Sequence, residues 1–218
     1  MTRQIHSLVT PVIALAAFAI ATPVFAGPPL LCHPFEIGTA RSLPWDGQAG
    51  WSHGKADYKI ENLISETEAL LTPSTPVVVR METLRRAALY ASRNPHVAKE
   101  LLGRLTARAE ASEAGGDPDA LAFLDAAYVA EAFREIASLG GSEFAGRAPG
   151  VRAAIGRAEG YALIRRSISA RPDDPAIQFA AALIAAGKDR GRYTDHAAKA
   201  RAGAAADTLL ARNLKLVQ

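Results

Sequence analysis

The stretch NPHVAKELLGRLTARAEASEAGGDP, residues 94–118, contains one complete helix and the start of the next. Asn94, followed by proline, opens the first helix, and Asp117, again followed by proline, opens its successor. The Asn or Asp side chain accepts hydrogen bonds from the free N–H groups of the first turn, and proline takes a position where no N–H is needed. The two starts predict consecutive helices with short connections, and therefore an all-α fold.

Helical periodicity extends on both sides of this stretch, from Asp57 nearly to the C-terminus. A third start of the same type, Asp174 with Pro175, begins a later helix. The segment PVVVR, residues 76–80, is the sole strand candidate, although its proline suits a helix start equally well. We expect helices over residues 57–71, 76–93, 95–114, 118–139, 151–170 and from 175 onward.

Two of these helices contain residues that are unusual for their position. In the helix over residues 118–139, Asp125 points toward a wide apolar face. Such a carboxylate is either functional or hydrogen-bonded to a neighbouring tyrosine or helix end. In the helix over residues 151–170, Gly156 and Gly160 are spaced so that another backbone can approach closely.

Residues 27–56 differ in character from this helical part. They contain four prolines, several glycines and both tryptophans of the chain, and they show no helical period. This composition predicts an extended arm with turns. The expected organisation is therefore a signal peptide over residues 1–26, an arm over residues 27–56 and a helical domain over residues 57–218.

Residues 1–26 have the pattern of a cleavable secretory signal. A positively charged start precedes the apolar run at residues 12–20, and Val24 and Ala26 occupy the small positions that signal peptidase reads. The run is shorter than the roughly 20 residues that a bilayer requires, which argues against a transmembrane helix. We expect cleavage before Gly27, a secreted or periplasmic location and no transmembrane segment in the mature chain.

The charge of the chain is close to balanced. The formal net charge is +3, and it falls to +2 when the signal, with its single arginine, is removed. A charge this small gives no reason to expect nucleic acid or an anionic membrane as a partner.

The segment ARPDDPAIQFAAALIAAGKDRGRYTDHAAKARAG, residues 170–203, resembles a helical hairpin of the tetratricopeptide family. The similar elements are Pro172, an apolar first helix through Phe179 and Leu183, a turn at Gly187, and a second helix from near Tyr193 with Ala197 and Ala200. The resemblance covers roughly one unit. It implies a repeat-like array of hairpins and a binding or scaffold function, with a protein or peptide as the partner.

Cys32 is the only cysteine, so an exported chain cannot use it in an internal disulfide. It is buried, bridged to another molecule, modified or bound to a ligand. Its thiolate and the imidazoles of His33 and His53 suit copper or zinc, which makes metal or haem handling an alternative function. Haem attachment lacks the usual second cysteine. A shared metal ion requires a turn at Pro34, because adjacent residues of an extended chain point to opposite sides.

The stretch GWSHG, residues 50–54, matches the nucleophile-elbow pattern G-x-S-x-G around Ser52. That pattern has catalytic meaning where a strand leads through a sharp turn into a helix. Strand patterning is nearly absent from this chain, which favours a glycine-rich turn. A hydrolase using Ser52 is therefore a third and less favoured alternative, and catalysis is not the expected function.

Overall fold

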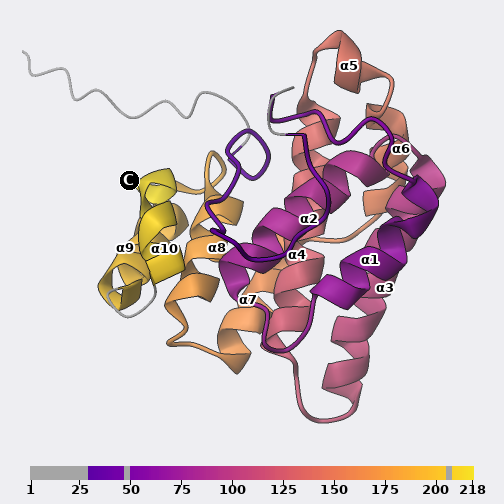
Figure 1. Ribbon diagram of the computed structural model, residues 1–218. Helices are drawn as coiled ribbons and strands as arrows, with labels where there is room; N and C mark the ends of the chain where they lie inside the picture. Colours follow the sequence, from indigo (N-terminus) through magenta and orange to yellow (C-terminus); the bar gives the residue numbers. More distant parts are fainter. Residues whose placement is uncertain (1–28, 47–49, 205–207) are drawn as a thin grey trace, which may run out of the picture.

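The computed structural model describes residues 29–46, 50–204 and 208–218, so the signal peptide expected over residues 1–26 lies outside the described residues. Within these ranges the chain is helical and has no strand, only an isolated bridge between Trp45 and Gly54 (Figure 1). The all-α prediction is confirmed. Over the same ranges, no helix combines the length and the apolar character needed to cross a membrane.

The helices differ widely in length. They are α1 (Leu63–Leu70), α2 (Val77–Ala91), α3 (Pro95–Ala114), α4 (Ala120–Ser138), α5 (Ser142–Ala145), α6 (Ala148–Ile155), α7 (Gly160–Ala170), α8 (Pro175–Ala185), α9 (Arg190–Gly203) and α10 (Thr208–Asn213). Short 3-10 helices precede α1 and follow α10. The strand candidate at residues 76–80 is the start of α2.

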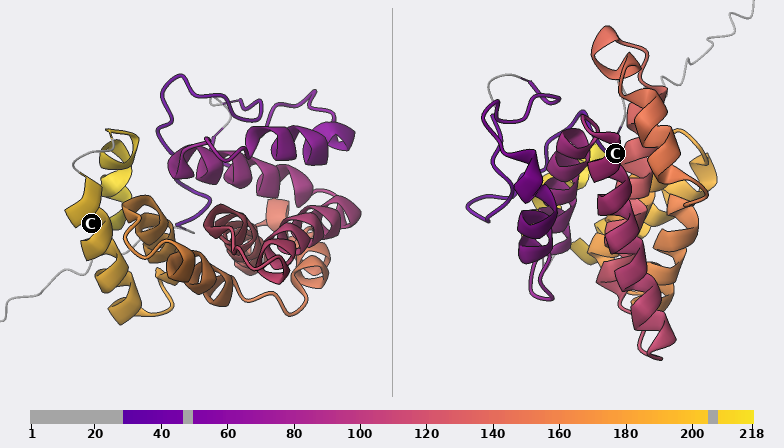
Figure 2. Two further views of the ribbon diagram at one scale, coloured as in Figure 1. Left: turned by 90° about the horizontal axis from the view of Figure 1, so that it is seen from below. Right: turned by 90° about the vertical axis from the view of Figure 1, so that its right-hand side faces the viewer.

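Helix α4 is the centre of the fold. Every residue from 120 to 133 is buried, which is typical of a helix that is surrounded on all sides. Helices α2, α3, α6, α7 and α8 all contact it. Figures 1 and 2 show α1–α3 on one side of α4 and α8–α10 on the other.

This arrangement does not confirm a tetratricopeptide-like array. In a solenoid each repeat contacts only its neighbours in sequence, whereas here α4 contacts α7 and α8, and α2 also contacts α8. The local hairpin of the resembling segment is present: α8 packs against α9, and the turn between them contains Gly187 with a positive φ of 73°. Helix α9 begins at Arg190, earlier than expected, because Asp189 caps it.

Two of the three expected helix starts are confirmed. The Asn94 side chain accepts hydrogen bonds from the N–H groups of His96 and Val97, and the Asp174 side chain does the same for the first turn of α8. In both helices proline follows the cap, as the sequence pattern predicts.

The start predicted at Asp117 is wrong. Helix α4 begins at Ala120, and its N-cap is Asp119, whose carboxylate accepts a hydrogen bond from the N–H of Leu121 at 2.9 Å. The loop before α4 folds back on α3, because the Asp119 N–H donates to the Ser112 hydroxyl at 3.0 Å. This contact shifts the helix start by two residues and leaves Asp117 in the loop.

The prediction of a single helix over residues 151–170 is also wrong. The chain forms α6 and α7 instead, with a break at Gly156, whose φ of +52° is strained for any residue with a side chain. Gly160 makes a close approach, but to a side chain: a Cβ at this position would lie 2.2 Å from Cγ of Glu131. The Gly160 N–H donates to the Glu131 carboxylate at 3.1 Å, so this buried carboxylate accepts from the start of α7.

Candidate functional site

The described parts of the arm, residues 29–46 and 50–56, are packed into the helical domain and run across α2 (Figure 1). Leu31 and Leu43 are fully buried, and the ring of Phe35 lies edge-on to Tyr128 of α4 and Phe179 of α8. The arm therefore supplies part of the core between α4 and α8. Its position depends on polar contacts as well as on this apolar packing.

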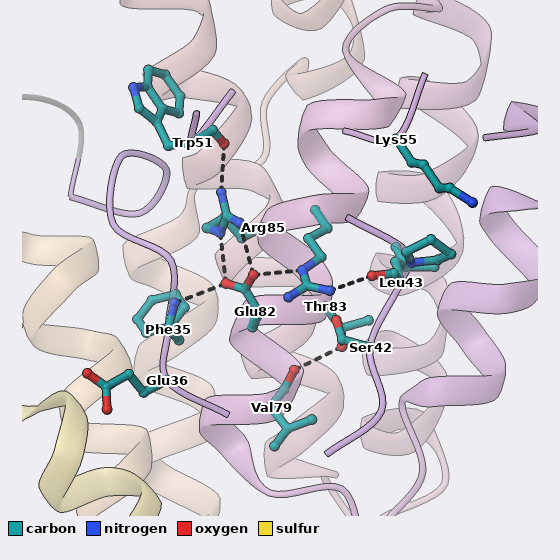
Figure 3. A network of polar contacts seen from close by, with 12 residues as sticks. Phe35, Glu36, Ser42, Leu43, Trp51, Lys55, Val79, Glu82, Thr83 and Arg85 are labelled. Atoms are coloured by element: carbon teal, nitrogen blue, oxygen red, sulfur yellow. Dashed lines mark hydrogen bonds and ion pairs between the residues drawn. The ribbon is translucent and has the colours of Figure 1, made fainter. Parts of the chain in front are cut away.

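Glu82 of α2 binds the arm through a buried carboxylate (Figure 3). The carboxylate accepts the N–H of Phe35 at 3.1 Å, Nε and Nη2 of Arg85 at 2.8 and 2.9 Å, and Nε of Arg86 at 2.7 Å. The two arginines also donate to carbonyl oxygens of the arm, those of Leu31, Trp51 and Leu43. One buried carboxylate thus links α2 to three segments of the arm.

The first described residues of the arm contact a partly buried carboxylate, that of Glu135 on α4. It accepts the N–H of Leu30 at 3.1 Å. Burial raises the pKa of Glu135 to about 8, while the Leu30 N–H and the positive charge of Lys188 lower it and Glu131 adds to the rise.

Cys32 follows in the arm and is a partly exposed, free thiol. Burial, and to a lesser degree the charge of Glu135, raises its pKa to about 11, although Arg85 acts in the opposite direction. His33 is partly buried and His53 is exposed. Across residues 29–46, 50–204 and 208–218, no three His, Cys, Asp or Glu residues are grouped closely enough to hold a metal ion. The copper or zinc site of Cys32, His33 and His53 thus stays a prediction without geometric support.

The raised pKa of Cys32 predicts low thiol reactivity. Since the thiolate is the reacting form, a shift from 9.0 to about 11 lowers the thiolate fraction near neutral pH about a hundredfold. We expect Ellman's reagent to react far more slowly with the folded protein than with the same chain unfolded in urea. Equal rates in the two states would contradict this environment for Cys32.

The GWSHG turn, residues 50–54, packs on the ring of Tyr90. A Cβ at Gly54 would lie 2.3 Å from that ring, so the last glycine of the pattern is required by this close approach. The Tyr90 hydroxyl accepts the N–H of Lys55 and donates to the carbonyl oxygen of Pro44, both at 2.7 Å. Packing against Tyr90 thus accounts for the glycine at position 54.

Ser52 within this turn is buried and contacts two polar groups. Its hydroxyl lies 3.0 Å from Nδ1 of His53 and 3.4 Å from a carboxylate oxygen of Glu143. In a Ser–His–acid chain the imidazole lies between the hydroxyl and the carboxylate. Here the hydroxyl lies between the other two groups, so the contacts do not support Ser52 as an activated nucleophile.

A pocket of about 530 Å³ opens between α2, α3, the start of α4 and the end of α7. This volume is in the range of natural ligand sites. Its buried wall includes Arg80 and Leu121, and its exposed rim includes Asp117 and Arg171. Arg108 of α3 lines the pocket between these levels and is partly exposed.

Asp125 of α4 binds two of the arginines that line this pocket. Its carboxylate accepts Nε and Nη2 of Arg80 at 2.9 and 2.5 Å, and it also accepts Nη2 of Arg108. Burial raises the pKa of Asp125, while Arg80 and, more weakly, Arg108 lower it. The two guanidinium groups supply the counter-charge for this buried carboxylate. The prediction that Asp125 is hydrogen-bonded to a tyrosine or a helix end is wrong, because its partners are arginines of α2 and α3.

The arginines of the pocket differ in how fully they are bonded. Every nitrogen of the Arg80 guanidinium has a partner, since Nη1 donates to the carbonyl oxygen of Thr72 at 2.6 Å while Nε and Nη2 bind Asp125. Nε of Arg108 is buried and has no hydrogen-bond partner among the described residues. Within the described ranges, the guanidinium of Arg171 is exposed and has no ion-pair or hydrogen-bond partner. Two arginines of the pocket therefore retain unused donors.

The sequence alone did not identify this pocket, because Arg80, Arg108 and Arg171 are far apart along the chain. No protein-family model matches the chain, and no curated protein or solved structure shows significant similarity to it. The functional interpretation therefore depends on the geometry of the pocket.

Proposed function

We propose that the chain is an exported, helical binding protein whose ligand occupies the pocket between α2, α3, α4 and α7. The observation that carries this proposal is a pocket of about 530 Å³ in which Arg108 and Arg171 have unused hydrogen-bond donors. Ligand sites typically combine a preformed concave surface with a few polar groups that orient the ligand. The volume suits a small molecule or the end of a peptide.

The polar contacts behind the pocket support a preformed site. Asp125 joins α2 and α3 to α4 through Arg80 and Arg108, so three helices around the pocket share one buried ion-pair cluster. A site whose walls are fixed in advance loses less conformational freedom on binding. The export of this binding protein rests on the signal pattern of residues 1–26.

A variant that fills the pocket tests this proposal. Ala170 lies on the exposed rim at the end of α7, so Ala170→Trp is expected to occupy the pocket without disturbing the core. Ala202→Trp on the exposed surface of α9 is the matched control. We expect members of a mixed set of small acids, amines, sugars and short peptides to raise the melting temperature of the wild type and of the control, but not of Ala170→Trp.

Two results would contradict a binding function for this pocket. One is that no compound of the set raises the melting temperature of the wild type. The other is that the active compounds stabilise Ala170→Trp as much as the wild type, because their site then lies elsewhere.

A further inference from the structure

We infer that the pocket takes the oxyanion of its ligand, a carboxylate or a phosphate, and that Arg108 and Arg171 bind it. This inference rests on the proposed binding function and adds the chemical class of the ligand. Arginine is suited to this task because its planar guanidinium presents several donors in a geometry that matches oxyanions.

Arg108 contributes charge that the buried ion-pair cluster does not need. Arg80 already binds both oxygens of Asp125, through Nε to Oδ1 and through Nη2 to Oδ2. Arg108 adds a further bond to Oδ2 through Nη2 alone, so one carboxylate is shared by two guanidinium groups. The cluster therefore has one excess positive charge, located on the pocket wall.

Arg108 also has unused bonding capacity. Its Nε is buried and finds no hydrogen-bond partner in the part of the chain that the structure describes, which is costly for a charged donor. The side chain as a whole is 35% exposed and lines the pocket. An oxyanion there supplies an acceptor for the charge that Asp125 only partly balances.

Arg171 supplies a second donor group from the end of α7. It follows the last residue of α7, lines the pocket and is exposed to solvent. Over the described residues its side chain makes no ion pair. No existing ion pair of Arg171 therefore has to break before it binds a ligand. Arg108 and Arg171 together therefore present donors from α3 and α7 to one occupant.

Overall charge does not select the ligand, because the pocket also contains Asp117 and Asp119. The Asp119 carboxylate is used as the N-cap of α4, where the positive end of the helix offsets its charge. Asp117 is exposed on the rim, and its side chain has no partner within the described ranges. We expect it to repel an anion weakly, which gives the proposal a distinctive test.

The experiment measures dissociation constants by calorimetry for inorganic phosphate, succinate and a pair of N-acetylated peptides. The two peptides are identical except that one ends in a free carboxylate and the other in an amide. We expect the carboxylate peptide to bind and the amide to bind at least about tenfold more weakly, since a charged hydrogen bond is lost. Comparison of phosphate, succinate and the carboxylate peptide identifies which source of oxyanion the pocket prefers.

Variants then locate the binding groups. Arg171→Gln is expected to weaken oxyanion binding about threefold to tenfold, and its control, Arg165→Gln, is exposed on the same helix and outside the pocket. Arg108→Gln is expected to weaken binding by more than about tenfold. Asp117→Asn removes the opposing charge and is expected to tighten binding.

Three results would overturn the inference. The first is oxyanion affinity that Arg171→Gln and Arg108→Gln both leave unchanged, which indicates adventitious binding. The second is equal binding of the carboxylate and amide peptides. The third is weaker binding of the carboxylate peptide by Asp117→Asn, because removing a charge that repels an anion cannot weaken its binding. If neutral compounds bind and Ala170→Trp blocks them, the pocket still functions and only the oxyanion assignment fails.

Discussion

Replacing Glu82 with alanine is expected to lower the free energy of unfolding by about 3–5 kcal/mol, because breaking a buried ion pair leaves an uncompensated charge. Arg85 is fully buried and depends on Glu82 for two of its hydrogen bonds. The N–H of Phe35 loses its acceptor in the same variant. Urea denaturation followed by circular dichroism measures the change.

The loss of Glu82 should act on the arm in particular. Residues 29–56 are expected to become more sensitive to limited proteolysis than the helices, since the contacts of Glu82, Arg85 and Arg86 hold three arm segments. Glu110→Ala, at an exposed position of α3, is the control, with an expected change within about 0.5 kcal/mol. A Glu82→Ala protein as stable as this control would show that the buried cluster does not hold the arm.

Replacing Asp125 with alanine is the second large perturbation, with an expected loss of about 3–5 kcal/mol. The substitution leaves Arg80, which is 2% exposed, buried without a counter-charge, and it removes the link between α2, α3 and α4. The same urea titration measures the effect.

A double variant separates the loss of the ion pair from the loss of packing. Replacing buried charged partners together by apolar residues of similar size is often close to neutral. We therefore expect Arg80→Met combined with Asp125→Leu to recover much of the stability that Asp125→Ala loses. If the double variant is even less stable than Asp125→Ala, an uncompensated buried charge is not the cause of the loss in stability.

Sequence reasoning succeeded where local chemistry decides the structure. The caps at Asn94 and Asp174 depend only on the side chain and on the N–H groups of the next turn, so they could be predicted from the sequence. At Asp117 the pattern was equally good, but a contact between Asp119 and Ser112 of the preceding helix selected a later start. A tertiary contact of this kind has no local signature.

The candidate site was missed for a related reason. The predicted metal site rests on Cys32, the one cysteine of the chain, with His33 and His53, whereas the polar clusters of the fold use common arginines and carboxylates. A usable signal was present in α2, where Glu82 and Arg85 lie among apolar residues on every side of the helix. A helix buried all round must pair its charges, so such residues predict distant partners even when those partners cannot be named.

An NMR titration tests most directly whether the pocket is the binding site. In ¹H–¹⁵N spectra of the full chain, addition of the carboxylate peptide or of phosphate is predicted to shift the amide resonances of Ala120, Leu121 and Arg171 in a saturable manner, because these residues line the pocket. The resonances of Cys32 and His53 are predicted to stay in place. Saturable shifts confined to Cys32, His53 and their neighbours in the arm, with the pocket resonances unchanged, would contradict the proposal that the pocket is the binding site.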